Sequence, residues 1–428
     1  MKYERLAVAV MLKQNGVRVA NITLRGMTLV SKFVLLFFLA KFLQAGDVGL
    51  YGLLSATIGY ALYVVGFEFY NFSTREMIGE DPKHWLGMIR DQLTFYVILY
   101  CVFLPGALFI FYMGWLPWSH VFWFLVLALL EHIAQELNRI LVAISEQLLA
   151  SVVLFLRSGA WCLAVVAIMW ADTSARNLDV LLGGWVIGCS LGCILAIRKI
   201  CELDKASLGN KINWIWIVKG IKVAIPLLIA SLAMRGVFTF DRYWIESIAS
   251  LEVLGAYVLF VGMASAVLSF LDAGVIVFFY PKLVSSAKQR NLLLFNKDMK
   301  TLALNVVGVT VFLVLACYGV SGYVLYWLNN NIYSENVHIL YWLLLAVAIY
   351  SVSMIPHLGL YAFGFDKPLL YSQLAGLIVF LVGAYLLEGR EGVYAVPVSM
   401  CFAFGLILVW KLYAYYLMTR NQDLCVST

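Results

Sequence analysis

The segment Leu24-Arg25-Gly26-Met27-Thr28-Leu29-Val30-Ser31-Lys32 lies within the first long apolar stretch of the chain, residues 17–52. It is apolar enough for a membrane helix, yet it contains two cations. Seven residues of α-helix turn through about 700°, so Arg25 and Lys32 share a face to within about 20° and lie about 10 Å apart along the axis. A cation at the centre of a membrane helix costs about 2.5–3.5 kcal/mol on insertion scales. The shared stripe therefore predicts that this face borders protein or a water-filled cavity.

The same pattern returns 210 residues later, where Arg235-Gly236 matches Arg25-Gly26 and Arg242 matches Lys32. We expect these four cations to line an anion-accepting cavity between two similar halves, because Arg and Lys replace the hydration that an anion loses in a low-dielectric layer. Two alternatives stay open. Arg25 could extend to the cytoplasmic surface, as long basic side chains do near helix ends, and Arg242 could lie at the outer interface.

The composition identifies a membrane protein. Hydrophobic residues make up 63% of the 428 residues, charged residues only 13%, and the mean hydropathy is +0.91. A soluble protein of this length needs more surface charge, and apolar runs of about twenty residues recur from end to end. We attribute the net charge of +6 to basic loops on one side of a membrane rather than to nucleic-acid binding.

We predict an all-α polytopic fold with twelve transmembrane helices in two six-helix, pseudo-symmetric halves around a central cavity. The expected spans are residues 20–43, 51–70, 91–112, 120–140, 149–170, 180–197, 220–240, 254–275, 301–322, 338–361, 369–387 and 393–414. No cleavable signal peptide is evident in residues 1–13, so the first helix is expected to target the chain to the membrane. The even number of spans puts both termini on one side.

The distribution of Lys and Arg sets the orientation. With a cytoplasmic N-terminus, 22 of the 30 Lys and Arg residues, among them Lys411 near the end of the last span, fall in cytoplasmic segments. Only four fall outside, and positive charge marks the cytoplasmic side. Both termini are therefore predicted to be cytoplasmic.

The longest cytoplasmic loop divides the chain into residues 1–200, a linker at 201–219, and residues 220–428. Each half has an acidic residue and a Gly-x-Tyr after its first helix. These are Asp47 with Gly49-Leu50-Tyr51, and Glu252 with Gly255-Ala256-Tyr257. Repeats of this kind place a substrate site at the interface of the halves in many transporters.

Several of these segments resemble a known family. The run Gln44–Gly52 is similar to the turn after the first helix of polysaccharide flippases, and Asp241–Ile245 followed by Val253–Tyr257 is similar to its seventh-helix counterpart. The runs Gly66–Glu76 and Glu131–Arg139 resemble the second and fourth helices of O-antigen flippases. The resemblance points to the Wzx-type branch of the multidrug/oligosaccharidyl-lipid/polysaccharide exporter superfamily, with a MATE-like fold.

Such a resemblance implies a flippase of the bacterial inner membrane. It would move a polyprenyl-diphosphate-linked oligosaccharide, an O-antigen or other surface-polysaccharide repeat unit, to the periplasmic face by alternating access. No cofactor or metal is implied, and coupling to a proton or sodium gradient is open. Membrane lipids surround such a protein, and a polysaccharide polymerase or chain-length regulator is a candidate partner. We expect a monomer, because the cavity lies within one chain.

Other charged residues within or near the spans have two interpretations each. Glu131 and Arg157 lie at equal depth on adjacent helices, which predicts an ion pair that is either structural or part of a gate. The carboxylates that could couple transport to an ion, or could have a purely structural role, are Glu68, Glu136, Asp241 and Asp272. In the structural alternative Asp241, which adjoins Arg242, only orients it. Pro356 is expected to kink the tenth span, and His357 to be a hydrogen-bonded packing residue.

Alternative functions have weaker support in the sequence. A cation-coupled multidrug exporter of the same superfamily is the main alternative, but four cavity cations would repel cationic drugs. A lipid II flippase has a suitable substrate, but that family usually has fourteen helices. An enzyme of polysaccharide synthesis is disfavoured because every outer loop is short and no catalytic motif is evident.

Overall fold

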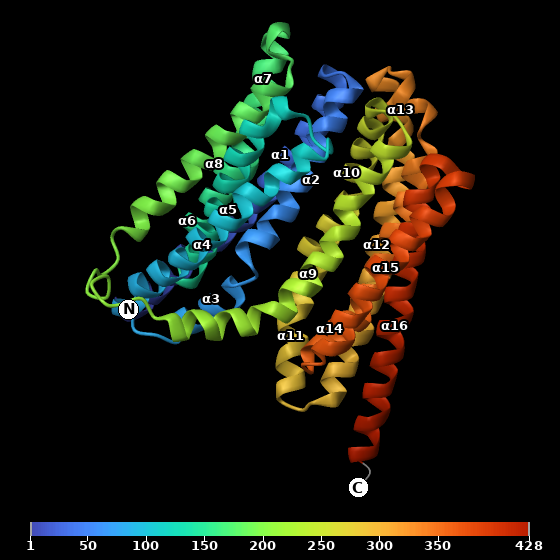
Figure 1. Cartoon of the computed structure of the whole chain (residues 1–428). Coiled ribbons are helices and arrows are strands. Elements are labelled where there is room, and N and C mark those ends of the chain that lie inside the picture. Colours follow the sequence, from blue (N-terminus) through green and yellow to red (C-terminus); the bar gives the residue numbers. More distant parts are fainter. Residues whose placement is uncertain (1, 427–428) are drawn as a thin grey trace. The chain divides into compact units, whose positions relative to one another are not determined.

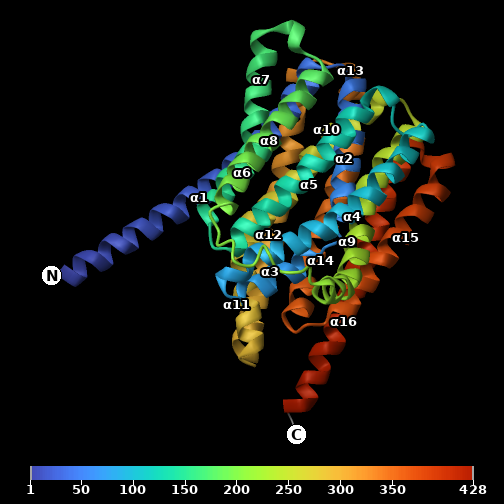
Figure 2. The ribbon, with the colours of Figure 1, turned by 60° about the vertical axis from the view of Figure 1, so that its left-hand side comes forward.

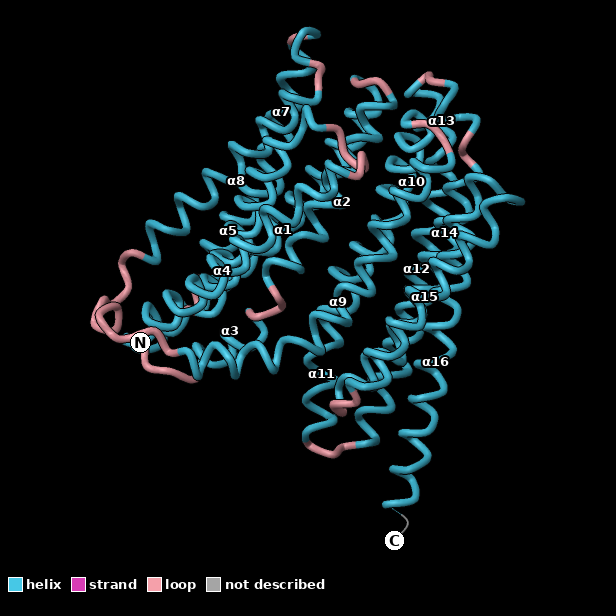
Figure 3. The backbone as a smooth tube through the Cα atoms, in the orientation of Figure 1, coloured by secondary structure: helices cyan, strands magenta, loops and turns pink. Residues whose placement is uncertain are grey.

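The computed structural model describes the backbone of residues 2–426 and the side chains of residues 16–420 except that of Arg18. Figure 3 shows this part of the chain as helices joined by short loops, with no strand in it. The predicted all-α fold is confirmed. The basic residues Lys2, Arg5, Lys13 and Arg18, which contribute to the predicted orientation, lie outside the described side chains.

The number of membrane-crossing helices agrees with the predicted twelve. Within the described residues, eleven helical segments are long and apolar enough to cross a membrane. The last of them, Asp366–Arg420, contains two helices, α15 and α16, which meet at a short 3-10 turn. Apolar runs of this length form helices in a membrane because a helix satisfies its own backbone hydrogen bonds.

The chain folds into two compact units. Unit 1 comprises residues 1–43 and 57–228, and unit 2 comprises residues 44–56 and 229–428. These boundaries differ from the predicted halves at residues 44–56 and 220–228. Both differences arise because α2 and α9 each contribute residues to both units.

The elements of the N-terminal part are helices and single turns (Figures 1 and 2). They are α1 (Lys2–Phe42), α2 (Ala45–Gly66), α3 (Tyr70–Ile78), η1 (Pro82–His84), α4 (Trp85–Tyr112), η2 (Trp118–His120), α5 (Val121–Ala143), α6 (Gln147–Phe155), η3 (Leu156–Ala160), α7 (Trp161–Ala171), η4 (Thr173–Ala175) and α8 (Leu178–Ile200). The remaining elements are α9 (Trp214–Ile248), α10 (Leu251–Leu271), η5 (Asp272–Ile276), α11 (Val277–Lys288), α12 (Leu292–Leu328), α13 (Asn331–Glu335), α14 (His338–Ala362), α15 (Asp366–Glu391), η6 (Gly392–Tyr394) and α16 (Ala395–Val426).

In unit 1, α1 packs against the continuous helix formed by α6, η3 and α7, and α8 packs against α5 and the same helix. Small residues on α8 allow this close approach. A Cβ added at Gly188 would lie 2.4 Å from Trp161 Cδ1, and one at Gly192 would lie 3.5 Å from Arg157 Cβ. The segment containing Cys189 and Cys193 is thus a packing face, and the small side chains let the backbones come together.

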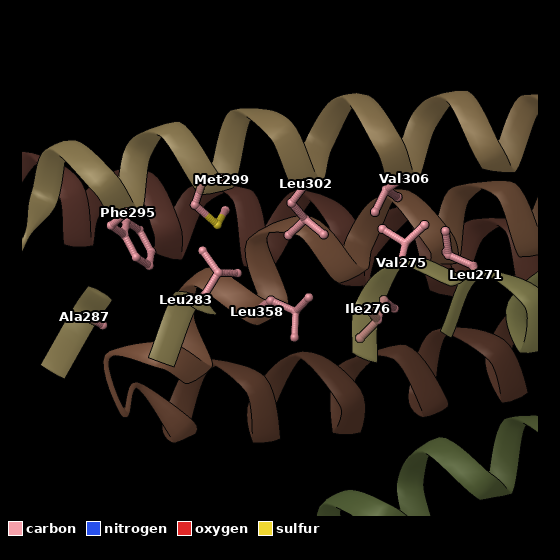
Figure 4. Close-up of a cluster of buried hydrophobic side chains, with 10 residues drawn as sticks. All are labelled: Leu271, Val275, Ile276, Leu283, Ala287, Phe295, Met299, Leu302, Val306 and Leu358. Atoms are coloured by element: carbon pink, nitrogen blue, oxygen red, sulfur yellow. The ribbon is translucent and has the colours of Figure 1, made fainter. Parts of the chain in front are cut away.

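In unit 2, α10, α11, α12 and α14 pack around an apolar core. Figure 4 shows Phe295, Met299, Leu302 and Val306 of α12 pointing toward side chains of α10, η5, α11 and α14. Figure 1 shows α15 and α16 running side by side next to α14, and these three helices pack on one another.

Two of the long helices contain a π-helical turn that the sequence does not reveal. These turns are η3, which carries Arg157, and η5, which begins at Asp272. A π-helical turn inserts one residue into an α-helix and is often found at functional sites. Each of the two turns carries one of the charged residues that the sequence singles out.

The loop between α8 and α9 is shorter than the predicted linker, because α9 already begins at Trp214. The loop is held to the start of α4. Arg90 donates to the carbonyl oxygens of Leu208 at 2.7 Å and Lys211 at 3.1 Å, and Gly87 N–H donates to Ser207 Oγ at 2.9 Å. The backbone N–H groups in the first turn of a helix have no partner within the helix, and the hydrogen bond from Gly87 to Ser207 satisfies one of those of α4.

The first part of α2 packs against the first part of α10 within unit 2. A Cβ at Gly49 would lie 2.4 Å from the carbonyl oxygen of Leu251, and one at Gly255 would lie 1.9 Å from that of Ala45. These glycines belong to the two Gly-x-Tyr motifs that the sequence matches. The matched motifs therefore contact each other, and glycine is required because the two backbones touch.

Candidate functional site

The candidate site of unit 1 is a group of charged side chains contributed by α1, α5 and η3. On α1, Thr28 faces η3, since a Cβ at Gly159 would lie 3.0 Å from Thr28 Cα. Lys32 follows Thr28 by one turn and so lies on the same face. Its side chain is exposed and lies within electrostatic range of Arg157 and Glu131. Lys32 thus faces the same pair of residues that the sequence predicts to interact.

Glu131 and Arg157 form the expected ion pair, with Arg157 Nε 2.7 Å from Glu131 Oε2. Glu131 is 6% exposed, and its other oxygen accepts hydrogen bonds from Trp185 Nε1 at 2.6 Å and Cys189 Sγ at 3.4 Å. A buried carboxylate needs such partners, because an uncompensated buried charge is costly. Whether the pair also acts in gating stays a prediction.

The charge in this group does not balance. Lys32 and Arg157 are cations, and Glu131 is the carboxylate that acts on both. Arg25 lies two turns before Lys32 on the same stripe, with an exposed side chain. Among the described residues, neither Arg25 nor Lys32 makes a hydrogen bond or an ion pair. The stripe on α1 therefore carries positive charge that the described part of the protein does not neutralise.

The candidate site of unit 2 contains Arg235 of α9, whose side chain is exposed. Arg235 and Asp272 both act electrostatically on Tyr350 of α14. Asp272 is the first residue of the π-helical turn η5, and its side chain is exposed as well. The structure thus brings together two of the predicted residues, one cation and one carboxylate, around a tyrosine that the sequence analysis does not identify.

Arg242 has a different environment from Arg235. Its guanidinium lies 3.3 Å from Asp241 Oδ1 and donates to the carbonyl oxygen of Phe238. Asp241 is fully buried, and it also accepts hydrogen bonds from the backbone N–H of Arg242 and from Tyr257 OH, each at 2.8 Å. Arg242 is therefore engaged in a local structural pair, which favours the alternative in which Asp241 orients Arg242.

Glu136 and Glu68 lie in a polar network at the ends of α2, α4 and α5. Glu136 accepts hydrogen bonds from Gln92 Nε2 at 2.9 Å and Tyr96 OH at 2.7 Å, and it pairs with Arg139. These three partners are enough to stabilise the Glu136 carboxylate in the folded protein. The arrangement therefore supports a structural role for Glu136.

Glu68 follows the end of α2 in an unusual turn. Phe67 and Glu68 both have φ of 54°, a left-handed conformation that is unfavourable for residues other than glycine. The Glu68 carboxylate accepts a hydrogen bond from Asn71 Nδ2 at 2.5 Å. It borders a small cavity that is partly open to the outside, with Leu62, Tyr63, Gly66, Gln135 and Arg139 as the other lining residues. Two of the family-like segments, Gly66–Glu76 and Glu131–Arg139, therefore meet at this cavity.

The structure corrects two expectations near the end of the chain. Lys411, counted among the cytoplasmic cations, is only 1% exposed and lies within the helix bundle of unit 2. His357, expected to be hydrogen-bonded, has a buried Nδ1 without a hydrogen-bond partner among the described residues. The apolar surroundings of Lys411 in the sequence could have indicated its burial, since it is the only charged residue between residues 395 and 419.

No protein-family model and no curated protein sequence matches this chain. Solved structures do share its fold. A multidrug resistance MATE family transporter of the MOP superfamily, in an inward-facing conformation, matches with a TM-score of 0.78 and 10% identity over 94% of this chain and 99% of that chain. The lipid II flippase MurJ, in an inward closed conformation, matches with a TM-score of 0.69 and 11% identity over 93% of this chain and 87% of that chain. The bent form of the Vibrio cholerae MATE transporter VcmN matches with a TM-score of 0.56 and 13% identity over 95% and 99% of the two chains.

These matches extend over nearly the whole chain at low sequence identity. They establish the fold alone, because they cover 93–95% of this chain at 10–13% sequence identity. The chain therefore has the fold that MATE transporters of the MOP superfamily share with the flippase MurJ.

Proposed function

We propose that this protein is a flippase that moves a polyprenyl-diphosphate-linked oligosaccharide across the bacterial inner membrane by alternating access. The observation that carries the proposal is the stripe of Arg25 and Lys32 on α1, which holds positive charge within a membrane helix. Arg235, at the matching position of α9, also has an exposed side chain. Such charge is retained in a membrane helix at a cost in free energy, and it commonly marks a substrate pathway.

A lipid diphosphate suits this charge pattern. It carries at least two negative charges, and it must leave water as it crosses the membrane. Arg matches phosphate oxygens with two parallel hydrogen bonds, and Lys acts as a mobile point charge. In our proposal Lys32 and Arg25 receive the diphosphate, and Arg157 is held in place beside them by Glu131.

The fold supports a transport function, since the structures that share it are described as transporters and as a flippase. Because the structures with this fold include a multidrug resistance transporter, a multidrug exporter is the second candidate function. The exposed cations on α1 and α9 favour an anionic substrate over a cationic drug. A lipid II flippase shares the diphosphate chemistry, and the glycan distinguishes it from our proposal.

The remaining parts of the proposal concern the cofactor, the oligomeric state, the orientation, the energy source and the protein partner. We propose that the protein works without a cofactor, acts as a monomer and has both termini in the cytoplasm. A proton or sodium gradient supplies the energy. A polysaccharide polymerase or chain-length regulator is the expected protein partner on the outer side.

Reconstituted protein and a fluorescent polyprenyl-diphosphate glycan provide the test. We expect the double variant Arg25→Gln/Lys32→Gln to flip this lipid at least about tenfold more slowly than the wild type, since two charge-assisted contacts are lost. Lys41→Gln is the matched control. Lys41 belongs to the same helix, but it lies nine residues from Lys32 and so about 180° around the axis.

Three outcomes would decide against the proposal. The first is unchanged flipping by the double variant at a normal amount of folded protein. The second is an equal loss in Lys41→Gln, which would show a general effect of charge on α1. The third is transport of cationic drugs by the wild type with no flipping of the diphosphate lipid, which would favour the multidrug exporter.

A further inference from the structure

The C-terminal helix of unit 2 contains a lysine in an unexpected place. Lys411 of α16 is 1% exposed, although it carries one of the most strongly hydrated groups in proteins. α16 packs against α14 and α15, so the side chain lies within this three-helix bundle. Removing an ammonium ion from water costs several kcal/mol unless an opposite charge lies close by.

No such opposite charge acts on Lys411 among the described residues. α14 contains no Asp or Glu, and α15 carries its charges in its first and last turns. The other charged residues on the helices that pack around α14 and α16 act electrostatically on neither Lys411 nor His357. They are Arg235, Asp241, Arg242, Glu246, Glu252, Asp272, Lys282, Lys288, Lys297, Asp298, Lys300, Asp366, Lys367, Glu388, Arg390, Glu391 and Arg420.

The register of α15 and α16 places two hydroxyl groups near the level of Lys411. Gly376 of α15 faces Ile407 of α16, since a Cβ at Gly376 would lie 2.5 Å from Ile407 Cδ1. The two helices are antiparallel, so Ser372 lies at the level of Lys411. Tyr415 follows Lys411 by one turn, and its ring packs against Gly359 of α14. Both hydroxyl groups can accept a hydrogen bond from an amine.

The second basic group at this place is His357 of α14. It lies within electrostatic range of Lys411, and its Nδ1 is buried without a hydrogen-bond partner among the described residues. The contact between Gly359 and Tyr415 sets the register of α14 and α16. His357 precedes Gly359 by two residues and Lys411 precedes Tyr415 by four, so the two basic residues lie at a similar level. His357 follows Pro356, which removes a backbone hydrogen bond inside α14.

We propose that Lys411 and His357 form a proton-binding site in unit 2 that holds at most one proton. Two neighbouring basic groups without a carboxylate repel each other when both are charged. A proton is the ligand that suits the site, because a side chain with 1% of its surface accessible leaves no room for a phosphate or a lipid headgroup. In the binding step hydronium transfers its proton to Lys411 Nζ or His357 Nδ1 and leaves as water.

Binding of this proton should loosen the packing of α14 and α16. The charged site gains free energy from contact with water, and the kink at Pro356 offers a place where α14 can bend. The same proton would then be released when the helices close. This site would bind its proton through basic side chains, whereas the candidate coupling residues Glu68 and Asp272 are carboxylates elsewhere in the chain.

Hydrogen–deuterium exchange of the full chain in lipid nanodiscs, at about pH 6 and about pH 8, tests the proposal without any substrate. After correction for the intrinsic exchange rate, we expect amides at residues 350–362 and 405–418 of the wild type to open more readily at the lower pH. The opening constant should change by up to about tenfold per pH unit, because one proton is bound on opening. Amides of α5 and α8 in unit 1 serve as the internal reference.

Variants assign the effect to the two residues. Lys411→Met, which keeps the length of the side chain, should reduce the pH dependence to the part that His357 alone contributes, and Lys411→Arg should keep both segments open at either pH. His357→Gln should shift the midpoint of the pH dependence, and it gives a second measurement if Lys411→Met does not fold. A wild type without pH-dependent opening of these segments, or an unchanged dependence in Lys411→Met, would overturn the proposal. Neither outcome bears on the proposed substrate.

Discussion

At the scale of single residues, the ion pair between Glu131 and Arg157 is the interaction most open to measurement. Because both groups are largely buried, we expect Glu131→Gln to destabilise the protein by about 3–5 kcal/mol, the usual cost of leaving one member of a buried pair uncompensated. The double variant Glu131→Gln/Arg157→Gln should lose less than the sum of the single variants, by about 0.5–3 kcal/mol. Unfolding in detergent by denaturant measures these differences.

Trp185→Phe separates the pair from the other partner of Glu131. This variant removes the 2.6 Å hydrogen bond to Glu131 but leaves Arg157 in place. It should cost about 1–3 kcal/mol, as expected for a buried acceptor that loses a donor. Strictly additive losses in the double variant would contradict a direct interaction between Glu131 and Arg157.

Residue patterns reveal which charges lie inside the membrane, but not which of them are paired. The spacing of Glu131 and Arg157 predicts their interaction because both lie at the same depth on adjacent helices. Arg242 and Arg235 occupy similar positions in the sequence, yet only Arg242 has an adjacent aspartate. The apolar run around Lys411 indicates that this lysine is buried, but its basic neighbour His357 follows only from the packing of α14 against α16.

At the scale of elements, the contact between α2 and α10 depends on glycine. A methyl group at Gly255 would lie 1.9 Å from the carbonyl oxygen of Ala45, so the helices would have to move apart. We expect Gly255→Ala to destabilise unit 2 by about 1–3 kcal/mol, as overpacking usually does. Thermal unfolding of the purified protein provides the measurement.

Gly59→Ala is the matched control for this prediction. Gly59 lies in the same helix as Gly49, and a Cβ there would meet nothing within 4 Å. Alanine is favoured over glycine inside a helix by about 0.5–1 kcal/mol, so the control should be slightly stabilised. Equal destabilisation of both variants would indicate that backbone contact at Gly255 is not the cause.

The helices themselves follow from hydrophobicity, which is why all twelve spans can be predicted. Their ends are less evident, because polar residues such as Lys297 and Lys300 continue a helix beyond the apolar stretch. The π-helical turns η3 and η5 and the left-handed turn at Phe67 and Glu68 have no sequence signature.

At the scale of the whole molecule, α9 is one of two helices, with α2, that contribute residues to both units. The boundary falls between Leu228 and Ile229, two residues after Pro226. Proline inside a helix removes one backbone hydrogen bond and costs about 3 kcal/mol relative to alanine. The missing hydrogen bond makes α9 easier to bend at this point.

We therefore expect Pro226→Ala to raise the stability of α9 but to lower the rate of transport by about tenfold or more, since alternating access requires bending that a regular helix resists. The measurement compares flipping in proteoliposomes with thermal unfolding of the same preparation. Pro105→Ala is the control, because Pro105 lies inside α4, and α4 belongs entirely to unit 1. If both variants flip at the wild-type rate, bending at Pro226 is not needed. If both are slow, the effect belongs to membrane helices in general, whereas slow flipping in Pro226→Ala alone places the hinge in α9.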